Sequence, residues 1–258
     1  MPARYGLIVA QSQSTHIIGS LNDIPLHDRT MPVDEFIGAT TPPDHWLMPG
    51  PNVLTLRVAE GTVGPTTAVK ATVWDGDENT KLAVIEWPTD FSNGDPRALL
   101  HGASPGHPVS VPFLIPEDHP RPFYMDAPEI DVPIQGDDAT WQPILDFHRA
   151  FEQGDRAGVT EGFALRAEVW DKAYDAEISK PGAIQEMVEK HVKGSYRMLP
   201  IDRDATRFER IAGGRMLRVK RLDGLPLIAG KGDHEGAEPA LLPMPFLVFH
   251  QGRYRIVF

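Results

Sequence analysis

Residues 47–58 read Leu-Met-Pro-Gly-Pro-Asn-Val-Leu-Thr-Leu-Arg-Val, a turn that leads into an alternating segment. The dipeptide Pro49-Gly50 is typical of a tight turn. Beyond it, Leu54, Leu56 and Val58 alternate with polar residues. Successive side chains of a strand point to opposite faces, so these three residues share one face. The stretch therefore predicts a strand with one buried face and one exposed face.

A β-hairpin is predicted directly after this strand. Residues 68–74 and 81–87 are both rich in β-branched and aromatic residues. Between them stands Asp75-Gly76-Asp77, and Asp-Gly between two such runs is a strong hairpin signal. Further strands are predicted at residues 5–10, 16–18, 109–115 and 129–134, with turns at Asn22-Asp23 and Pro25. About seven short strands joined by Pro-rich loops favour an antiparallel β-sandwich.

The hydrophobic period changes from 2 to 3.6 after Gln135-Gly-Asp-Asp138. Helices are predicted at residues 140–154, 155–176 and 181–192, the first with Thr140 as its N-cap and Pro143 in its first turn. Strands then return as hairpins at 208–211 with 216–222 and at 246–250 with 253–258, and residues 226–229 are expected to continue the first hairpin. Helices followed by an antiparallel sheet indicate an α+β fold.

The predicted architecture has two domains, 1–135 and 136–258. Residues 1–135 contain 7 Lys and Arg against 17 Asp and Glu, a net charge of −10. Residues 136–258 contain 18 against 19, a net charge of −1. An acidic first domain repels nucleic acid and anionic membranes. The excess of acid is expected mainly to serve solubility, and the alternative is that it attracts a basic protein partner.

The segment formed by Leu47, Pro49, Gly50, Asn52, Leu54, Leu56 and Val58 resembles one common in galactose-binding-like sandwich domains. In those domains the Pro-Gly-x-Asn turn delivers the chain into a core strand. The resemblance covers about a dozen residues and implies a jelly-roll-like sandwich, without implying that the domain binds sugar.

The second half resembles the NTF2-like superfamily in its order of elements, over about 120 residues. Its last strand, Gln251-Gly-Arg-Tyr-Arg-Ile-Val257, is similar to the final strand of that family. The resemblance implies helices packed in the curve of an antiparallel sheet. Members of the family are enzymes, ligand binders or interaction modules, so the fold does not select a function.

Several short motifs resemble catalytic or metal-binding sites but lack the required context. Residues 102–106 match G-x-S-x-G, yet prolines replace the helix that a nucleophile elbow needs. Asp75, Asp77, Asn79 and Glu86 have EF-hand-like spacing, yet Thr80 replaces the required glycine. Loop histidines (His27, His101, His107, His119 and His234) show no helical or H-x-H ligand spacing. A basic region spans residues 203–221, within a domain too close to neutral for a nucleic-acid interface, so an anionic ligand or a contact with the acidic first domain is expected instead.

The aromatic set on the predicted helices is the candidate ligand pocket. It comprises Trp141, His148, Trp170, Asp171 and Tyr174. In an NTF2-like cone these side chains would line a cavity, although aromatics at helical spacing more often form plain core. No catalytic residue, metal or cofactor is expected. The apolar run at residues 7–10 is too short for a signal peptide and no run is long enough to span a membrane, so a soluble, cytoplasmic protein is expected. The chain has no cysteine, which excludes disulfides and thiolate metal sites.

Three functions remain open from the sequence. The first is a non-catalytic interaction protein, such as an adaptor, an immunity-type protein or an accessory factor. The second is a small-molecule binder or enzyme that uses a cavity in the second domain. The third is carbohydrate binding by the first domain, which exposed Trp46, Trp74 or Trp87 would favour. A homodimer is also left open.

Overall fold

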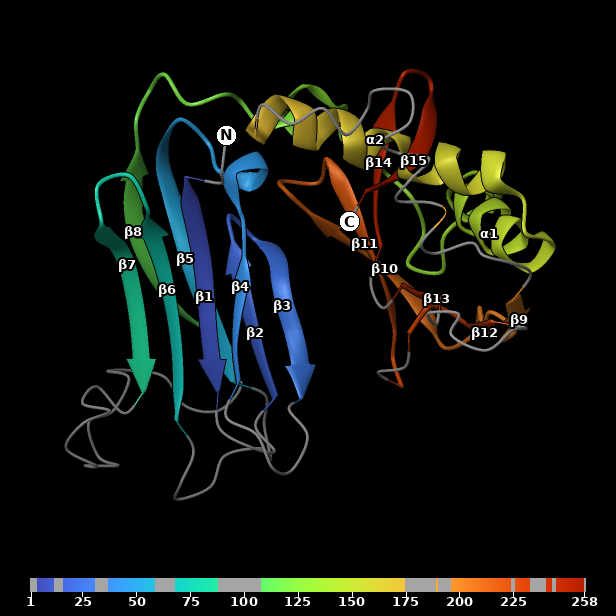
Figure 1. Ribbon diagram of the computed structural model, residues 1–258, viewed down its shortest axis with the longest axis horizontal. Helices are drawn as coiled ribbons and strands as arrows, with labels where there is room; N and C mark the ends of the chain where they lie inside the picture. The colour runs from blue at the N-terminus through green and yellow to red at the C-terminus, as the bar shows by residue number, and fades with distance from the viewer. Residues whose placement is uncertain are drawn as a thin grey trace. The chain divides into compact units, whose positions relative to one another are not determined.

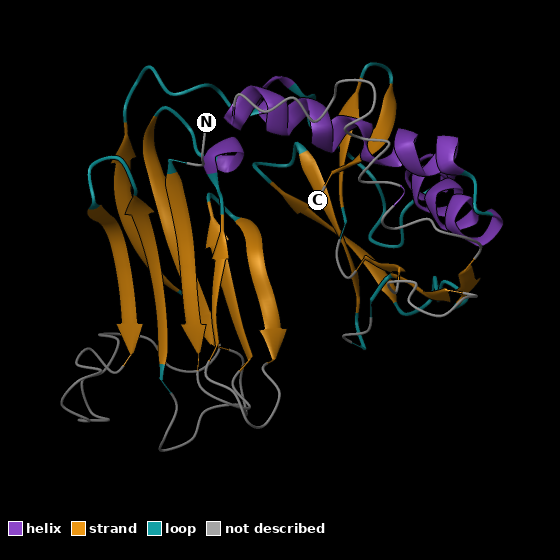
Figure 2. Ribbon diagram, in the orientation of Figure 1, coloured by secondary structure: helices purple, strands orange, loops and turns teal. Residues whose placement is uncertain are grey.

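The computed structural model describes residues 4–11, 16–30, 37–58, 68–87, 108–174, 189, 196–223, 226–232, 240–242 and 245–257. The chain forms two compact units, Met1–Pro122 and Phe123–Phe258. Within each unit the strands pair antiparallel, and the second unit adds two long helices (Figures 1 and 2). The structure therefore has the mainly β plus α+β class that the sequence predicts.

The first unit is a β-sandwich of two four-stranded sheets. One sheet has the order β4 (Ile37–Thr41), β1 (Tyr5–Gln11), β6 (Val69–Asp75), β7 (Thr80–Trp87). The other has the order β3 (Ile24–Thr30), β2 (His16–Leu21), β5 (Gly50–Val58), β8 (Val109–Ile115). Alternate residues of both sheets meet in one core, which includes Leu7, Val9, Ile17, Leu21, Leu54, Leu56, Val69, Val73, Ile85, Phe113 and Ile115.

The turn before β5 is organised by Asn52, whose side chain is fully buried. Its Oδ1 accepts hydrogen bonds from the Met48 backbone N–H at 2.8 Å and the Asn22 side chain at 2.7 Å. Its Nδ2 donates to the carbonyl oxygens of Met48 and Gly50. Gly50 has φ +79°, and a Cβ there would lie 2.9 Å from the Glu117 carboxylate. The Pro-Gly-x-Asn sequence therefore fixes the turn that leads the chain into β5.

Two strands of the sandwich escape sequence prediction, β3 and β4. Pro25 suggested a turn, but it lies in β3 opposite Ser20, beside an irregularity in the pairing. Because β3 is an edge strand, a residue without an N–H is tolerated there. The turn predicted at Asn22-Asp23 is confirmed, since Asn22 (φ 50°) and Asp23 (φ 64°) take left-handed conformations between β2 and β3.

The expected strand at residues 129–134 is wrong, because the structure has no strand there. The segment instead makes separate hydrogen bonds to the second unit. The Ile130 N–H donates to the Gly214 carbonyl, and the Phe208 N–H donates to the Ile134 carbonyl, each at 2.8 Å. These contacts place the segment in the second unit, so the division between units falls at Pro122 rather than at the predicted 135.

The second unit begins with a short 3-10 helix, η2 (Phe123–Asp126), and then two helices, α1 (Asp138–Gln153) and α2 (Arg156–Tyr174). Asp137, not Thr140, is the N-cap of α1, and Thr140 completes a reciprocal capping box. Gly154 ends α1 in the left-handed conformation at φ 62°. The third expected helix, at 181–192, lies largely outside the described residues.

Strands of the second unit form two sheets. The larger has the order β10 (Thr206–Ile211), β11 (Met216–Arg221), β14 (Phe246–His250), β15 (Arg253–Val257), which confirms both predicted hairpins. The smaller has the order β13 (Ala240–Leu242), β12 (Ile228–Gly232), β9 (Tyr196–Met198). Residues 226–229 therefore lead into a separate sheet and do not continue the first hairpin. The helices and the larger sheet share a core that includes Ile144, Phe147, Phe151, Phe163, Phe208, Leu217, Leu247 and Ile256.

Candidate functional site

The five residues predicted to line one pocket make separate contacts. Trp141, near the start of α1, is only 3% exposed and packs edge-on against Phe208 at 5.1 Å between ring centroids. Its Nε1–H donates to the Gln135 carbonyl at 2.9 Å. His148, two turns further along α1, pairs its Nε2 with the Leu199 carbonyl at 2.9 Å, not with a carboxylate.

Trp170, Asp171 and Tyr174 lie together near the end of α2. The Trp170 and Tyr174 rings meet edge to face at 5.3 Å, and the Arg166 guanidinium lies 4.8 Å from the Trp170 ring centroid. Of the five predicted residues, only Trp141 lines either of the pockets described in the second unit. Whether the other four contact a ligand stays a prediction.

An open pocket of about 480 Å³ lies beside the start of α1. Its walls come from residues 135–138, Trp141 and the turn before β10, with Arg203, Asp204 and Arg207. The turn is held by Asp202, whose Oδ1 accepts the Ala205 N–H at 3.0 Å. The helix start and this turn therefore bring segments some 65 positions apart in the sequence to one cavity.

Two arginines of this pocket differ in how they are held. The Arg203 guanidinium lies 4.9 Å from the centroid of the Trp141 ring. Within the described residues, none of its side-chain N–H groups has a hydrogen-bond acceptor. Arg207 uses Nη1 to donate to the carbonyl oxygens of Asp204 and Thr206, at 2.8 and 2.7 Å. The pocket thus keeps guanidinium donors available for an oxyanion.

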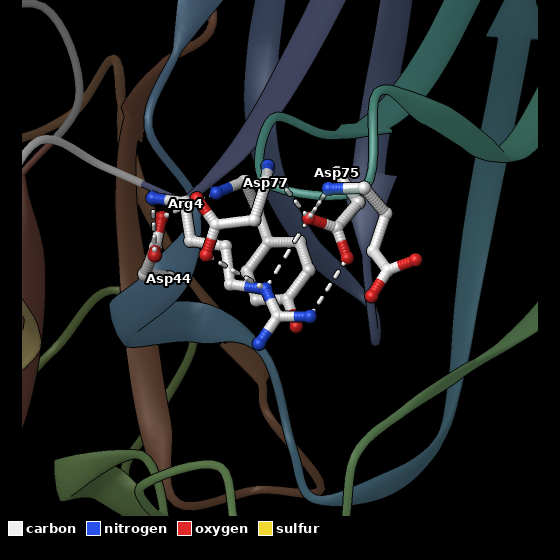
Figure 3. Close-up of polar contacts among 6 residues, drawn as sticks. Arg4, Asp44, Asp75 and Asp77 are labelled. Atoms are coloured by element: carbon white, nitrogen blue, oxygen red, sulfur yellow. Dashed lines mark hydrogen bonds and ion pairs between the residues drawn. The ribbon is translucent and has the colours of Figure 1, made fainter.

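A second polar cluster lies at one end of the sandwich, where β1 begins and the β6–β7 turn returns (Figure 3). Arg4 donates from Nε and Nη2 to the two oxygens of Asp75, at 3.2 and 2.9 Å. Its guanidinium also lies 3.7 Å from Asp77 and 5.0 Å from the centroid of the Tyr5 ring. Arg4 therefore ties the N-terminal strand to the hairpin turn.

Two carboxylates of this cluster have opposite pKa shifts. Burial raises the pKa of Asp44, although it accepts the backbone N–H groups of Arg4 and Tyr5 at 3.0 and 3.3 Å. Burial also acts on Asp75, but hydrogen bonds from Arg4 and the Glu78 backbone N–H outweigh it and lower the pKa of Asp75. His119 joins the cluster, with its Nε2 2.9 Å from the Asp44 carbonyl oxygen.

The same end of the sandwich presents several exposed carboxylates, which we call the acidic end. They come from the β2–β3 turn, the β6–β7 turn and the segment after β8: Asp23, Asp77, Glu78, Glu117 and Asp118. Tyr5 pairs with Asp75 in one sheet, while in the other Gly50 pairs with Ile115 and the Asn22 N–H donates to the Val53 carbonyl. Asp44 joins the two sets, since it accepts the Arg4 N–H at its side chain and lies within hydrogen-bond distance of His119 at its carbonyl. Two exposed cations, Lys81 and Arg121, also lie there.

The structure describes only some of the remaining residues that the sequence suggested as carbohydrate, metal or catalytic sites. Trp46 is buried at 2% exposure and Trp74 is half-buried, so neither is the exposed platform that the carbohydrate hypothesis required, and the side chain of Trp87 lies outside the description. The EF-hand-like residues form the β6–β7 hairpin. Residues 102–106, His101, His107 and His234 lie outside the described residues. Among those described, no three His, Asp or Glu side chains gather as metal ligands.

Sequence reasoning missed Arg4, and it did not foresee the contact that positions Arg203. Arg4 precedes the first strand and gave no motif, because its partner Asp75 is 71 positions away. Arg203 belonged to the predicted basic region, but its contact with the Trp141 ring could not be predicted because the two residues are far apart in the sequence. A signal did exist for the acidic end, namely the excess of Asp and Glu in the first half.

Comparisons with known proteins return no match: no family model fits the chain, and neither the curated proteins nor the solved structures contain a significant relative. The resemblances to galactose-binding-like and NTF2-like domains stay predictions. Among the described residues, no helix is long and apolar enough to cross a membrane.

Proposed function

We propose that this protein is a non-catalytic interaction protein that binds a basic surface of a protein partner through the acidic end of its first unit. The observation that carries the proposal is the gathering of Asp23, Asp77, Glu78, Glu117 and Asp118 on adjoining turns. Clustered charge of one sign steers a partner of the opposite sign and orients it on approach.

The buried charges beneath these turns support a binding role. Asp75 is 3% exposed and is engaged by Arg4, while Asp44 is 5% exposed and is held by two backbone N–H groups. Asp75 thus holds the β6–β7 turn, and Asp44 holds the start of β1. The exposed carboxylates remain at the surface, where a partner's Lys and Arg side chains can reach them.

The boundary at Pro122 changes the net charge of each unit from the values calculated for a boundary at 135. Residues 1–122 contain 7 Lys and Arg against 14 Asp and Glu, a net charge of −7, whereas residues 123–258 contain 18 against 22, a net of −4. The first unit is still the more acidic, but the contrast is smaller than the sequence suggested. The proposal therefore rests on the local clustering of carboxylates, with nucleic acid disfavoured as a partner. A cytoplasmic location stays a prediction.

A charge-reversal comparison tests the proposal. The acidic-end variant carries Glu78→Lys and Asp118→Lys, and the matched control carries Glu129→Lys and Glu152→Lys in the second unit. All four side chains are exposed, and both variants change the net charge by the same amount. Each tagged protein captures partners from cell lysate at two salt concentrations, followed by quantitative mass spectrometry.

We expect the wild type and the control to retain one stoichiometric basic partner, and the acidic-end variant to lose it. Retention should weaken as salt rises, because exposed charges are screened over about 8 Å at physiological ionic strength. Equal capture by both variants would exclude the acidic end as the binding surface. A defined turnover activity with no stoichiometric partner would refute the interaction role itself.

A further inference from the structure

The pocket beside α1 has a mixed charge that constrains its ligand. Arg203 and Arg207 line it together with three carboxylates, Asp137, Asp138 and Asp204. Asp137 Oδ1 already accepts hydrogen bonds from the backbone N–H and the hydroxyl of Thr140, at 2.9 and 3.0 Å. Asp138 and Asp204 are exposed. The lining is therefore close to neutral but contains separate cationic and anionic groups.

The arginines suit a carboxylate. The Arg203 guanidinium lies over the buried Trp141 ring, 4.9 Å from its centroid, and this contact uses none of its N–H donors. A guanidinium held in this way pairs with a carboxylate through two parallel hydrogen bonds. A simple anion would gain this contact, but it would also face three carboxylates. The ligand that suits both sets of groups carries a positive charge as well.

Size narrows the choice further. A volume of about 480 Å³ falls within the range of small-molecule pockets, about 300 to 1,000 Å³. We propose that the pocket binds a short peptide with free ends, its terminal carboxylate on Arg203 and its terminal ammonium on Asp138 or Asp204. This site is independent of the acidic end, so either proposal can fail without the other.

The test uses tri-alanine as the probe on the full-length protein. Binding is followed by NMR through the Trp141 indole N–H, assigned with a Trp141→Phe variant. Three further probes separate the charges: N-acetyl-tri-alanine, tri-alanine amide and inorganic phosphate. Single alanine distinguishes a peptide from a free amino acid.

We expect a saturable shift with tri-alanine, and affinity about tenfold lower when either end group is blocked, because each blocked end removes one charged hydrogen-bond partner. Arg203→Gln should abolish the preference for the free carboxylate over the amide. Asp138→Asn combined with Asp204→Asn should abolish the preference for the free ammonium. The exposed Arg197→Gln and Glu129→Gln variants serve as controls and should leave both preferences intact.

Three results would overturn the proposal. The first is no saturable shift with tri-alanine up to about 10 mM, where a Kd of about 1 mM would be nearly saturated. The second is equal binding of the doubly free and the blocked peptides. The third is tighter binding of phosphate or of single alanine than of tri-alanine, which would assign the pocket to an anion or to a free amino acid.

Discussion

The two units are both built on antiparallel sheets, but they accommodate buried polar groups in different ways. In the sandwich, Asn52 and Asp44 turn their side chains onto the backbone and so hold strand ends together. In the second unit, the buried Arg255 is 8% exposed and lies 3.5 Å from Glu168 and 3.8 Å from Glu161, both on α2. The first arrangement secures turns, whereas the second secures a helix to a sheet.

This difference has an energetic consequence. The side chains of Asn52 and Asp44 satisfy backbone groups at strand ends, and their loss leaves those groups without partners. The Arg255 ion pairs use Glu161 and Glu168, which are 55% and 40% exposed, so they contribute little and the second unit depends mainly on its packed core. We therefore expect the sandwich to be most sensitive to loss of polar side chains, and the second unit to be most sensitive to changes in packing.

The largest expected effect is in the sandwich. Asn52→Ala should lower the free energy of unfolding by about 3 kcal/mol, because it removes four hydrogen bonds and leaves their partners, among them the buried Gly50 carbonyl, without the Asn52 amide. Urea denaturation measures the loss. Thr55→Val on the same strand removes only an exposed hydroxyl pair with Ser110 and should cost under about 0.5 kcal/mol. Similar losses for the two variants would contradict the role assigned to the Asn52 amide.

Packing of the two helices gives the next largest effect. A Cβ on Gly162 of α2 would lie 2.1 Å from Cδ2 of Phe147 on α1. Gly162→Ala should therefore destabilise the protein by about 2 kcal/mol, despite the better helix propensity of alanine. Gly19→Ala is the matched control in the sandwich, since its Cβ would meet neighbours at an ordinary 3.6 Å. If both variants unfold at the wild-type urea concentration, α1 and α2 are not packed as described.

The Arg4 cluster should show a smaller, pH-dependent effect. Asp75→Asn should cost about 1 kcal/mol at neutral pH, because Arg4 is partly exposed to solvent and its ion pair is weakened accordingly. The lowered pKa of Asp75 stabilises the fold above its unfolded pKa near 3.8, and this contribution is lost as the pH falls through the folded pKa. The variant should thus lose less stability in acid than the wild type, as measured by thermal unfolding from pH 7 to pH 3.

Asp44 provides the opposite case within the same cluster. Because its folded pKa is raised, the folded state binds a proton more readily, and stability falls as the pH rises from about 3.8 through that pKa. Asp44→Asn should remove this decline, so the variant loses more stability in acid, relative to pH 7, than the wild type does. Parallel pH profiles for the Asp44 and Asp75 variants would contradict the opposite directions of the two pKa shifts.

The smallest expected effect concerns His250 in β14. Burial, together with the charge of Arg255 and Lys172, lowers the pKa of His250, while Glu168 opposes the shift. The unfolded chain then binds the proton first, so stability falls as the pH drops below about 6.5 toward the folded pKa. His250→Gln should flatten the thermal unfolding profile between pH 7 and pH 5, relative to the wild type. An unchanged profile would show that the ring titrates equally in both states.

Much of the fold follows from local patterns. The strand β8 matches the predicted range, and both hairpins of the larger second sheet follow from alternating residues around Gly-containing turns. The two helices follow from apolar spacing between Asp137 and Tyr174. Prediction failed where tertiary context overrode a local signal, as with Pro25 in an edge strand and residues 129–134 beside the β10–β11 hairpin.

The candidate sites were less predictable than the fold. Trp141 was identified from the sequence, yet its role depends on Arg203, which lies 62 positions later. Gly162 illustrates the same limit. By sequence it is only a weak helix former, whereas in the structure it admits the Phe147 ring. Propensity describes a residue and its neighbours in the chain, but it contains no information about a ring on another helix.

The amino-acid sequence by itself determined the class of the fold, the change from strands to helices near residue 138, and the excess of acid in the first half. These properties depend on the periodicity of apolar residues and on composition, both of which can be read directly from the sequence. Only the tertiary structure decided that the boundary lies at Pro122, that Asp44 and Asp75 have opposite pKa shifts, and that Trp141 supports Arg203. Each of these depends on burial and on contacts between distant segments, which exist only once the chain is packed.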